Sequence, residues 1–186
     1  MKRWIKNHGG ALALAGVFLS LNLVFFFLSP DQIVEYVGVE NTYLTVFLIA
    51  SVGGLSVITS GVLYASIIAF AAGGASPWLL GLVGGIGIAI GDSLVFYLFS
   101  HTSKKLSPRW QEKVTKVKEK VEHLPSTVQY VLIYLYLGFT PLPNDILMFL
   151  LAVLRFQFWQ VFPFILAGTI TVATLIAYLG EALPFL

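Results

Sequence analysis

The feature that most constrains this chain is the way in which its few charged residues divide it into long apolar segments. Only 11% of its 186 residues are charged and 58% are hydrophobic, whereas a soluble domain carries about 25% charged and 45–50% apolar residues. So few charges cannot cover the surface of a soluble domain, and disorder requires low hydrophobicity. The sequence therefore predicts a small, all-α, polytopic membrane protein.

Composition also excludes several kinds of site. The net charge of +2 is too small to indicate nucleic acid as a partner, and the absence of cysteine removes disulfides, thiolate metal sites and thiol nucleophiles. His8, His101 and His123 are too widely separated to predict a metal site. No motif of a metalloprotease, a serine hydrolase or a nucleotide-binding loop occurs. We expect neither an enzyme nor a cofactor.

Three apolar segments are long enough to cross a bilayer. Ala11–Ser29, Pro77–Phe99 and Phe158–Gly180 are predicted to be spanning helices, at about 1.5 Å of rise per residue. The alternative for the first is a cleaved signal peptide. Its apolar run is long for that role, and no small-residue cleavage site precedes Pro30.

Two further apolar segments are interrupted. The segment 43–74 is broken at Gly53 and Gly54, and 127–154 is broken by TPLPND at 140–145. The apolar arms on either side, about 10 to 14 residues each, are too short to span. We predict that each segment enters the membrane and returns as a re-entrant helical hairpin.

The basic residues decide the predicted topology. Seven of the eleven lie in 101–126, while all the charged residues of the connector 30–42 are acidic. If both hairpins return to the face from which they enter, all eleven lie on the cytoplasmic side, as the positive-inside rule requires. This predicts a multi-pass protein of the cell (plasma or inner) membrane, with its N-terminus and residues 101–126 cytoplasmic.

A hairpin followed by a span occurs twice, in opposite orientation. A shift of 84 residues pairs Gly84 with Gly168, but the repeat is inferred from hydropathy. Inverted repeats with broken helices are typical of transporters whose substrate binds near the midplane. We predict one membrane domain over 1–186, made of the first span and outer connector (1–42), the first repeat (43–100), a cytoplasmic amphipathic helix (101–126) and the second repeat (127–186).

The amphipathic helix is predicted from apolar residues that recur at helical spacing. It either lies on anionic headgroups or packs on the bundle as a connector. Its apolar positions are Trp110, Val114, Val117, Val121 and Leu124.

Two carboxylates lie at predicted membrane depth. Asp92 falls inside the second span, where a carboxylate is costly and a functional role is the default hypothesis. The alternative is a protonated carboxyl group that clasps a neighbouring backbone or hydroxyl group. Asp145 lies at the tip of the second hairpin, where capping of the returning half-helix is the alternative to function.

The prolines of the second break, Pro141 and Pro143, favour extended backbone at the residues before them, Thr140 and Leu142. Asn144 or Asp145 is then expected to cap the returning half-helix.

In the first break, the returning half-helix presents free N–H groups, which suit an anion such as phosphate. The alternative is that small residues let helices pack closely. The residues concerned are Gly53, Gly54, Thr59, Ser60 and Gly61.

Arg155 is the only basic residue between the second hairpin and the last span. It extends to the cytoplasmic headgroups, pairs with Asp145, or contacts a substrate phosphate.

These motifs resemble the DedA/VTT family, also called SNARE-associated membrane proteins. The likeness rests on Gly91-Asp92 followed by Tyr97, on FTPLPND, and on 152–158 followed by a glycine in the last helix, and it covers about 43–180. The resemblance implies movement of lipids across bilayers: recycling of undecaprenyl phosphate in bacteria and phospholipid scrambling in eukaryotes, often dependent on the proton-motive force.

The chain departs from the family pattern in its hairpins. Gly138 and Asn144 stand where arginines flank the family's second hairpin, and Ser100 replaces a common glycine. The first hairpin lacks the family's acidic residue and Pro-x-Pro tip. Recognition of phosphate by those arginines is therefore not carried over, and Asp92 and Asp145 remain for proton coupling.

The leading hypothesis is a lipid translocase, a flippase or scramblase, whose partners are membrane lipids (polyprenyl phosphate or phospholipid) and protons. The alternatives are a proton-coupled exporter of small solutes and a non-transporting membrane scaffold. Gly81 and Gly85 form a small-xxx-small pattern that serves either internal packing or a homo-oligomer interface.

Overall fold

The computed structural model describes residues 41–53, 57–102, 108–140 and 143–182, and within these ranges every regular element is a helix. The predicted all-α class is therefore confirmed. The predicted first span, Ala11–Ser29, and the connector that follows it lie outside the described residues.

Both predicted interruptions separate helices. The first hairpin segment forms α3 (Thr42–Gly53) and α4 (Val57–Ala72), and the second forms α7 (Ser126–Phe139) and α8 (Asn144–Val153). Each pair precedes a long helix, α5 (Pro77–Thr102) or α9 (Phe158–Glu181). The predicted amphipathic helix is α6 (Pro108–Glu122), which joins the two units.

The two long helices, α5 and α9, are long and apolar enough to cross a membrane, with a mean hydropathy of 2.0 in each. They match two of the predicted spans. The four shorter apolar helices do not reach that length.

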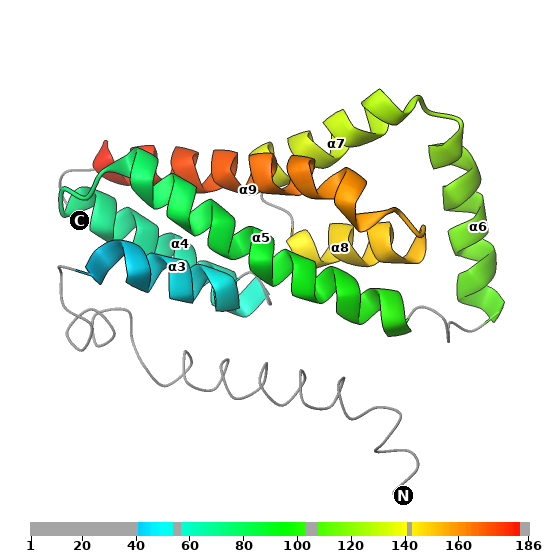
Figure 1. Ribbon diagram of the computed structural model, residues 1–186, viewed down its shortest axis with the longest axis horizontal. Helices are drawn as coiled ribbons and strands as arrows, with labels where there is room; N and C mark the ends of the chain where they lie inside the picture. The colour runs from blue at the N-terminus through cyan, green and yellow to red at the C-terminus, as the bar shows by residue number, and fades with distance from the viewer. Residues whose placement is uncertain (1–40, 54–56, 103–107, 141–142, 183–186) are drawn as a thin grey trace, which may run out of the picture.

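The two units lie in opposite directions (Figure 1). Helices α5 and α9 run antiparallel along the length of the bundle, with α3 and α4 at one end and α7 and α8 at the other. Helix α3 packs on α5 as α7 packs on α9, and α4 packs on α9 as α8 packs on α5. Both breaks consequently face the middle of the molecule.

The crossing of α5 and α9 depends on small residues. A Cβ atom added at Gly81 would lie 2.0 Å from Thr174 Oγ1, and one at Gly85 would lie 2.4 Å from Ile170 Cα. The Thr169 hydroxyl donates to the Gly85 carbonyl at 2.9 Å. Gly81 and Gly85 therefore serve internal packing, which was one of their two predicted roles.

A second glycine position is shared by the two long helices. Gly87 of α5 faces Ala50 of α3, and Gly168 of α9 faces Leu137 of α7; an added Cβ would lie 2.6 Å from each neighbour. Both glycines lie ten residues after the start of their helix (77 to 87, 158 to 168). Gly168 thus corresponds to Gly87, a shift of 81 residues, whereas the shift of 84 paired it with Gly84.

The turns that follow the two hairpins share the same geometry. Gly74 after α4 has φ 91° and Arg155 after α8 has φ 63°, and they too are 81 residues apart (155 − 74). Left-handed backbone costs a residue with a side chain roughly 1–2 kcal/mol, so glycine is the usual choice. The same hydrogen-bond pattern closes both turns: Gly74 N–H to Ala71 and Ala75 N–H to Phe70, Arg155 N–H to Ala152 and Phe156 N–H to Leu151.

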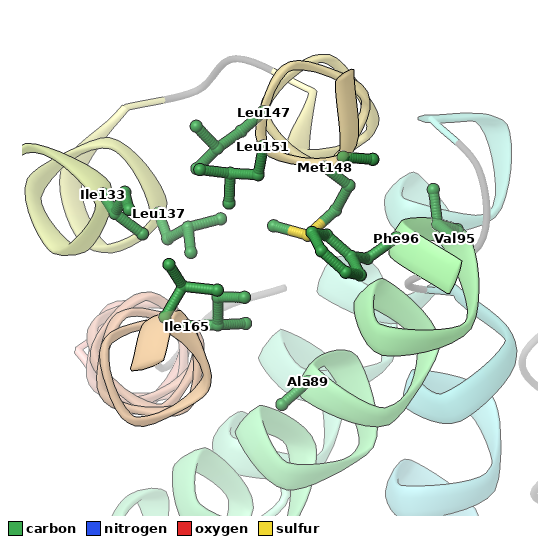
Figure 2. Close-up of a cluster of buried hydrophobic side chains, with 11 residues drawn as sticks. Ala89, Val95, Phe96, Ile133, Leu137, Leu147, Met148, Leu151 and Ile165 are labelled. Atoms are coloured by element: carbon green, nitrogen blue, oxygen red, sulfur yellow. The ribbon is translucent and has the colours of Figure 1, made fainter. Parts of the chain in front are cut away.

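Each hairpin has its own hydrophobic core. One core joins α3 and α4 to α5 and α9 around Ile67 and Leu80. The other joins α7 and α8 to the opposite halves of the long helices around Leu137 and Met148 (Figure 2). The arms α3 and α4 pack directly on each other, whereas α7 and α8 diverge (Figure 1).

We expect Gly85→Ala to lower the thermal midpoint by several degrees, because the new methyl group forces α5 and α9 apart at the Ile170 backbone. The matched control is Gly61→Ala in α4, where the added Cβ meets no atom within 4 Å. That change should leave the midpoint equal or higher, since alanine favours helix over glycine. Equal midpoints for the two variants would contradict this account of the crossing.

Candidate functional site

The centre of the candidate site is Asp92, whose side chain is fully buried in α5. Its Oδ2 atom accepts a hydrogen bond of 3.0 Å from the Asn144 side-chain amide. Within the described ranges, its Oδ1 atom is buried and has no partner. A buried carboxyl group with one oxygen left unbonded is expensive. The fold nevertheless keeps it where the first unit meets the break of the second.

The second break is built so that Asn144 reaches α5. Helix α7 ends at Phe139. Its C-cap residue, Thr140, has extended backbone (φ −106°, ψ 141°) and donates its hydroxyl to the Tyr136 carbonyl at 2.7 Å. The Tyr136 hydroxyl in turn donates to the Pro143 carbonyl at 3.0 Å. This tyrosine therefore joins the end of α7 to the start of α8 across the break.

The predicted cap of α8 is wrong. Pro143 occupies the N-cap position without a side-chain hydrogen bond, and Asn144 is the first helical residue. The Asn144 amide is thereby directed to Asp92 instead of its own helix. The extended backbone predicted for Thr140 is confirmed, and Pro141 and Leu142 lie outside the described residues.

Asp145 is half-buried in the first turn of α8. There its carboxylate faces the partly positive end of the helix, a favourable position. It lies within electrostatic range of both Asp92 and Tyr136. The two predicted carboxylates are thus neighbours across the α5–α8 contact, with Asn144 bonded to one of them.

At the first break, the Ser60 hydroxyl donates to the Gly53 carbonyl at 3.2 Å and so joins α4 to the end of α3. Gly53 is buried, and Gly61 lies in open space. Gly54 and the Thr59 side chain lie outside the described part of the structure. The described contacts of this break serve packing. Anion binding at this break stays a prediction.

Arg155 is not brought to the centre. It is exposed in the turn after α8, at the opposite end of that 10-residue helix from Asp145, about 15 Å away along the helix axis. Among the described residues the two form no ion pair.

Sequence reasoning missed three contributors to this region. Tyr136 joins the arms of the second break, Thr169 bonds α9 to α5, and Tyr64 of α4 lies within electrostatic reach of Asp92. The signal for the first two was a hydroxyl group on an apolar helix, since such groups bond across or within helices when lipid surrounds them.

The arrangement is suited to exchange of a proton or a hydrogen-bonding group at Asp92. The carboxyl group has one donor partner, a second carboxylate nearby, and a position where α5 meets the start of α8. Over the part of the chain that is described, no three acidic or histidine side chains gather as a metal site would require.

We expect Asn144→Leu to destabilise the fold by about 1–3 kcal/mol, because it removes the only hydrogen bond of a buried carboxyl group in the described structure. Asp92→Asn should keep the thermal midpoint at or above that of the parent, since it removes the ionisable group and keeps an acceptor oxygen for Asn144.

The double variant completes the cycle. In an Asp92→Ala background, which removes the acceptor oxygens, Asn144→Leu should cost less than it does alone, and the difference measures the coupling of the pair. Equal costs in both backgrounds would show that the two side chains are not coupled.

Comparison of the chain with protein-family models, with curated proteins and with solved structures gives no significant match.

Proposed function

We propose that this chain is an integral membrane lipid translocase related to the DedA/VTT proteins. In this proposal α3–α4 and α7–α8 are re-entrant hairpins that enter from opposite faces, α5 and α9 span the bilayer, and the N-terminal apolar segment is a third span. A lipid or lipid-linked phosphate headgroup passes between the hairpins, and Asp92 and Asp145 exchange protons as it does.

The outer surface of the helices supports a membrane location. Large apolar side chains on both hairpins and both long helices are about half-exposed, including Leu48, Leu94, Leu132 and Leu175. In water such a surface would drive association, whereas in lipid it costs nothing. Broken helices at that depth are tolerated only where protein or a cavity surrounds the break, and Asn144 at the second break is bonded to the fully buried Asp92.

The observation that carries the proposal is the bond between Asn144 and the fully buried Asp92. It joins the tip of one unit to the long helix of the other, so a relative movement of the units must make or break it. A buried ionisable group inside an apolar helix marks a substrate or proton pathway by default.

Because Asp92 is fully enclosed, transport requires α8 to move away from α5. Loss of the Asn144 bond then frees the Asp92 carboxyl group to accept or release a proton and to contact a polar headgroup. Asp145, at the start of the moving helix, travels with Asn144. The pair therefore couples opening of the site to its protonation, which is how a proton gradient would act on lipid movement.

The topology can be tested by single-cysteine labelling, since the natural chain has no cysteine. In intact cells, a membrane-impermeant maleimide should label Gln32→Cys in the outer connector. Lys118→Cys in α6 should react only after the membrane is opened. Labelling of both positions from outside would exclude two hairpins that return to their own faces.

Transport can be tested by leaflet exchange in liposomes that contain a fluorescent phospholipid. We expect exchange well above that of protein-free liposomes, and its loss in Asp92→Asn although that variant stays folded. The matched control is Glu112→Gln, an exposed carboxylate of α6 that pairs only with Lys116 in the described structure at 2.8 Å; it should exchange lipid like the parent chain.

Two results would replace the proposal. Exchange no faster than in empty liposomes, together with Asp92-dependent solute uptake under a pH gradient, would favour a small-solute exporter. Full cellular function of both Asp92→Asn and Asp145→Asn, with loss of function on disruption of 110–124, would favour a scaffold that acts through α6.

A further inference from the structure

A polar cavity of about 220 Å³ lies at the end of the bundle where α6, α7 and the α8–α9 turn meet. Two cations line it, Lys118 of α6 and Arg155 of the turn, together with the hydrogen-bonding side chains of Ser126, Gln157 and Gln160. Among its lining residues in the described ranges none is acidic. The cavity is therefore suited to an anion.

Two hydrogen bonds at the C-terminal end of α6 place the helix that carries Lys118 beside this cavity. The Gln129 side-chain amide on α7 donates to the Val121 carbonyl at 3.0 Å and to the Leu124 carbonyl at 2.9 Å. These two bonds hold the last turn of α6 against α7. Helix α6 thus stands across the end of the bundle (Figure 1) and turns one cation toward the α8–α9 turn.

An apolar groove of about 390 Å³ continues from this cavity between α7 and α8. The two spaces share four lining residues, Val121, Gln129, Leu154 and Phe156, so they lie next to each other. From there the groove is lined by leucine and isoleucine side chains and extends to Tyr136 and Thr140 at the second break. The divergence of α7 and α8 creates this groove.

Arg155 has a left-handed backbone conformation that is unfavourable for a residue with a side chain. Its φ of 63° is a conformation that favours glycine, and glycine is what the first unit has at the equivalent Gly74. An unfavourable backbone position retained by a charged residue points to a role for its side chain. The guanidinium group offers several donors in a planar fork that matches a phosphate group.

We propose that the cavity and groove together bind one anionic lipid, with its phosphate between Lys118 and Arg155 and an acyl or prenyl chain between α7 and α8. A cationic cavity beside an apolar groove fits an amphiphile better than a soluble anion, because a soluble anion would leave the groove empty. This inference rests on the proposed function, because it identifies where the translocated lipid is first held. The groove that would hold the lipid tail is lined at its far end by Tyr136. The hydroxyl group of Tyr136 bonds to Pro143, next to Asn144.

The binding test uses the full chain in neutral detergent and follows the thermal midpoint, because a ligand of the folded state raises it. Three probes separate the possible sources of binding: lyso-phosphatidylglycerol, lyso-phosphatidylcholine with the same acyl chain, and glycerol phosphate without a chain. We expect saturable binding of the first, about tenfold weaker binding of the second, and no shift with the third at equal concentration.

Arg155→Gly is the informative variant. It restores the residue that the backbone prefers, so the midpoint without lipid should be no lower than that of the parent, while the affinity for lyso-phosphatidylglycerol falls about tenfold. Its matched control is Lys116→Gln, an exposed cation of α6 outside the cavity, which should leave the affinity unchanged.

The groove is tested in the same way. Leu135→Trp places a larger side chain in the groove and should weaken binding of both lysolipids. Leu175→Trp, at a similarly exposed position of α9 (49% against 44%), should not.

Three results would overturn the site. They are unchanged lyso-phosphatidylglycerol binding in Arg155→Gly, an equal loss in Lys116→Gln, and a glycerol phosphate shift as large as that of the lipid. Leaflet exchange by a chain that shows no saturable lipid binding would reject this site alone. Specific binding by a chain that exchanges no lipid would support the site and reject the translocase.

Discussion

At Gly81 and Gly85 the backbone of α5 approaches α9 so closely that a methyl group on either glycine would overlap Thr174 or Ile170. This contact makes the two long helices one antiparallel frame, reinforced by the bond from Thr169 to the Gly85 carbonyl. Each hairpin then fills the space that the frame leaves at one end, and both breaks are directed to the middle. The position of Asp92 beside Asn144 follows from that geometry.

Asp92 does little for the stability of such a bundle. Its carboxyl group is fully buried, one oxygen has no partner in the described structure, and an apolar side chain of similar volume would fill the space at lower cost. Helices of this composition associate through close packing, to which the two cores already contribute. A costly group that packing does not require is what the proposed opening of the site would use.

The helical frame could be predicted from the sequence because it depends on local signals. Gly53-Gly54 and the proline pair at 141 and 143 mark the breaks, and the long apolar runs mark α5 and α9. The contacts could not be predicted. The partners Asp92 and Asn144 are 52 residues apart in sequence, and local capping preference assigned Asn144 to its own helix. Likewise the left-handed backbone at Arg155 has no local signal, since glycine is the residue expected there.

The matched turns at Gly74 and Arg155 give the bundle a chemical polarity that its backbone lacks. The two turns share their hydrogen-bond pattern, yet Arg155 places a cation at one end of the bundle and Gly74 has no side chain at the other. An anionic molecule is therefore attracted to the turn at Arg155 and not to the corresponding turn at Gly74. The difference between Gly74 and Arg155 therefore distinguishes the two ends of the bundle chemically.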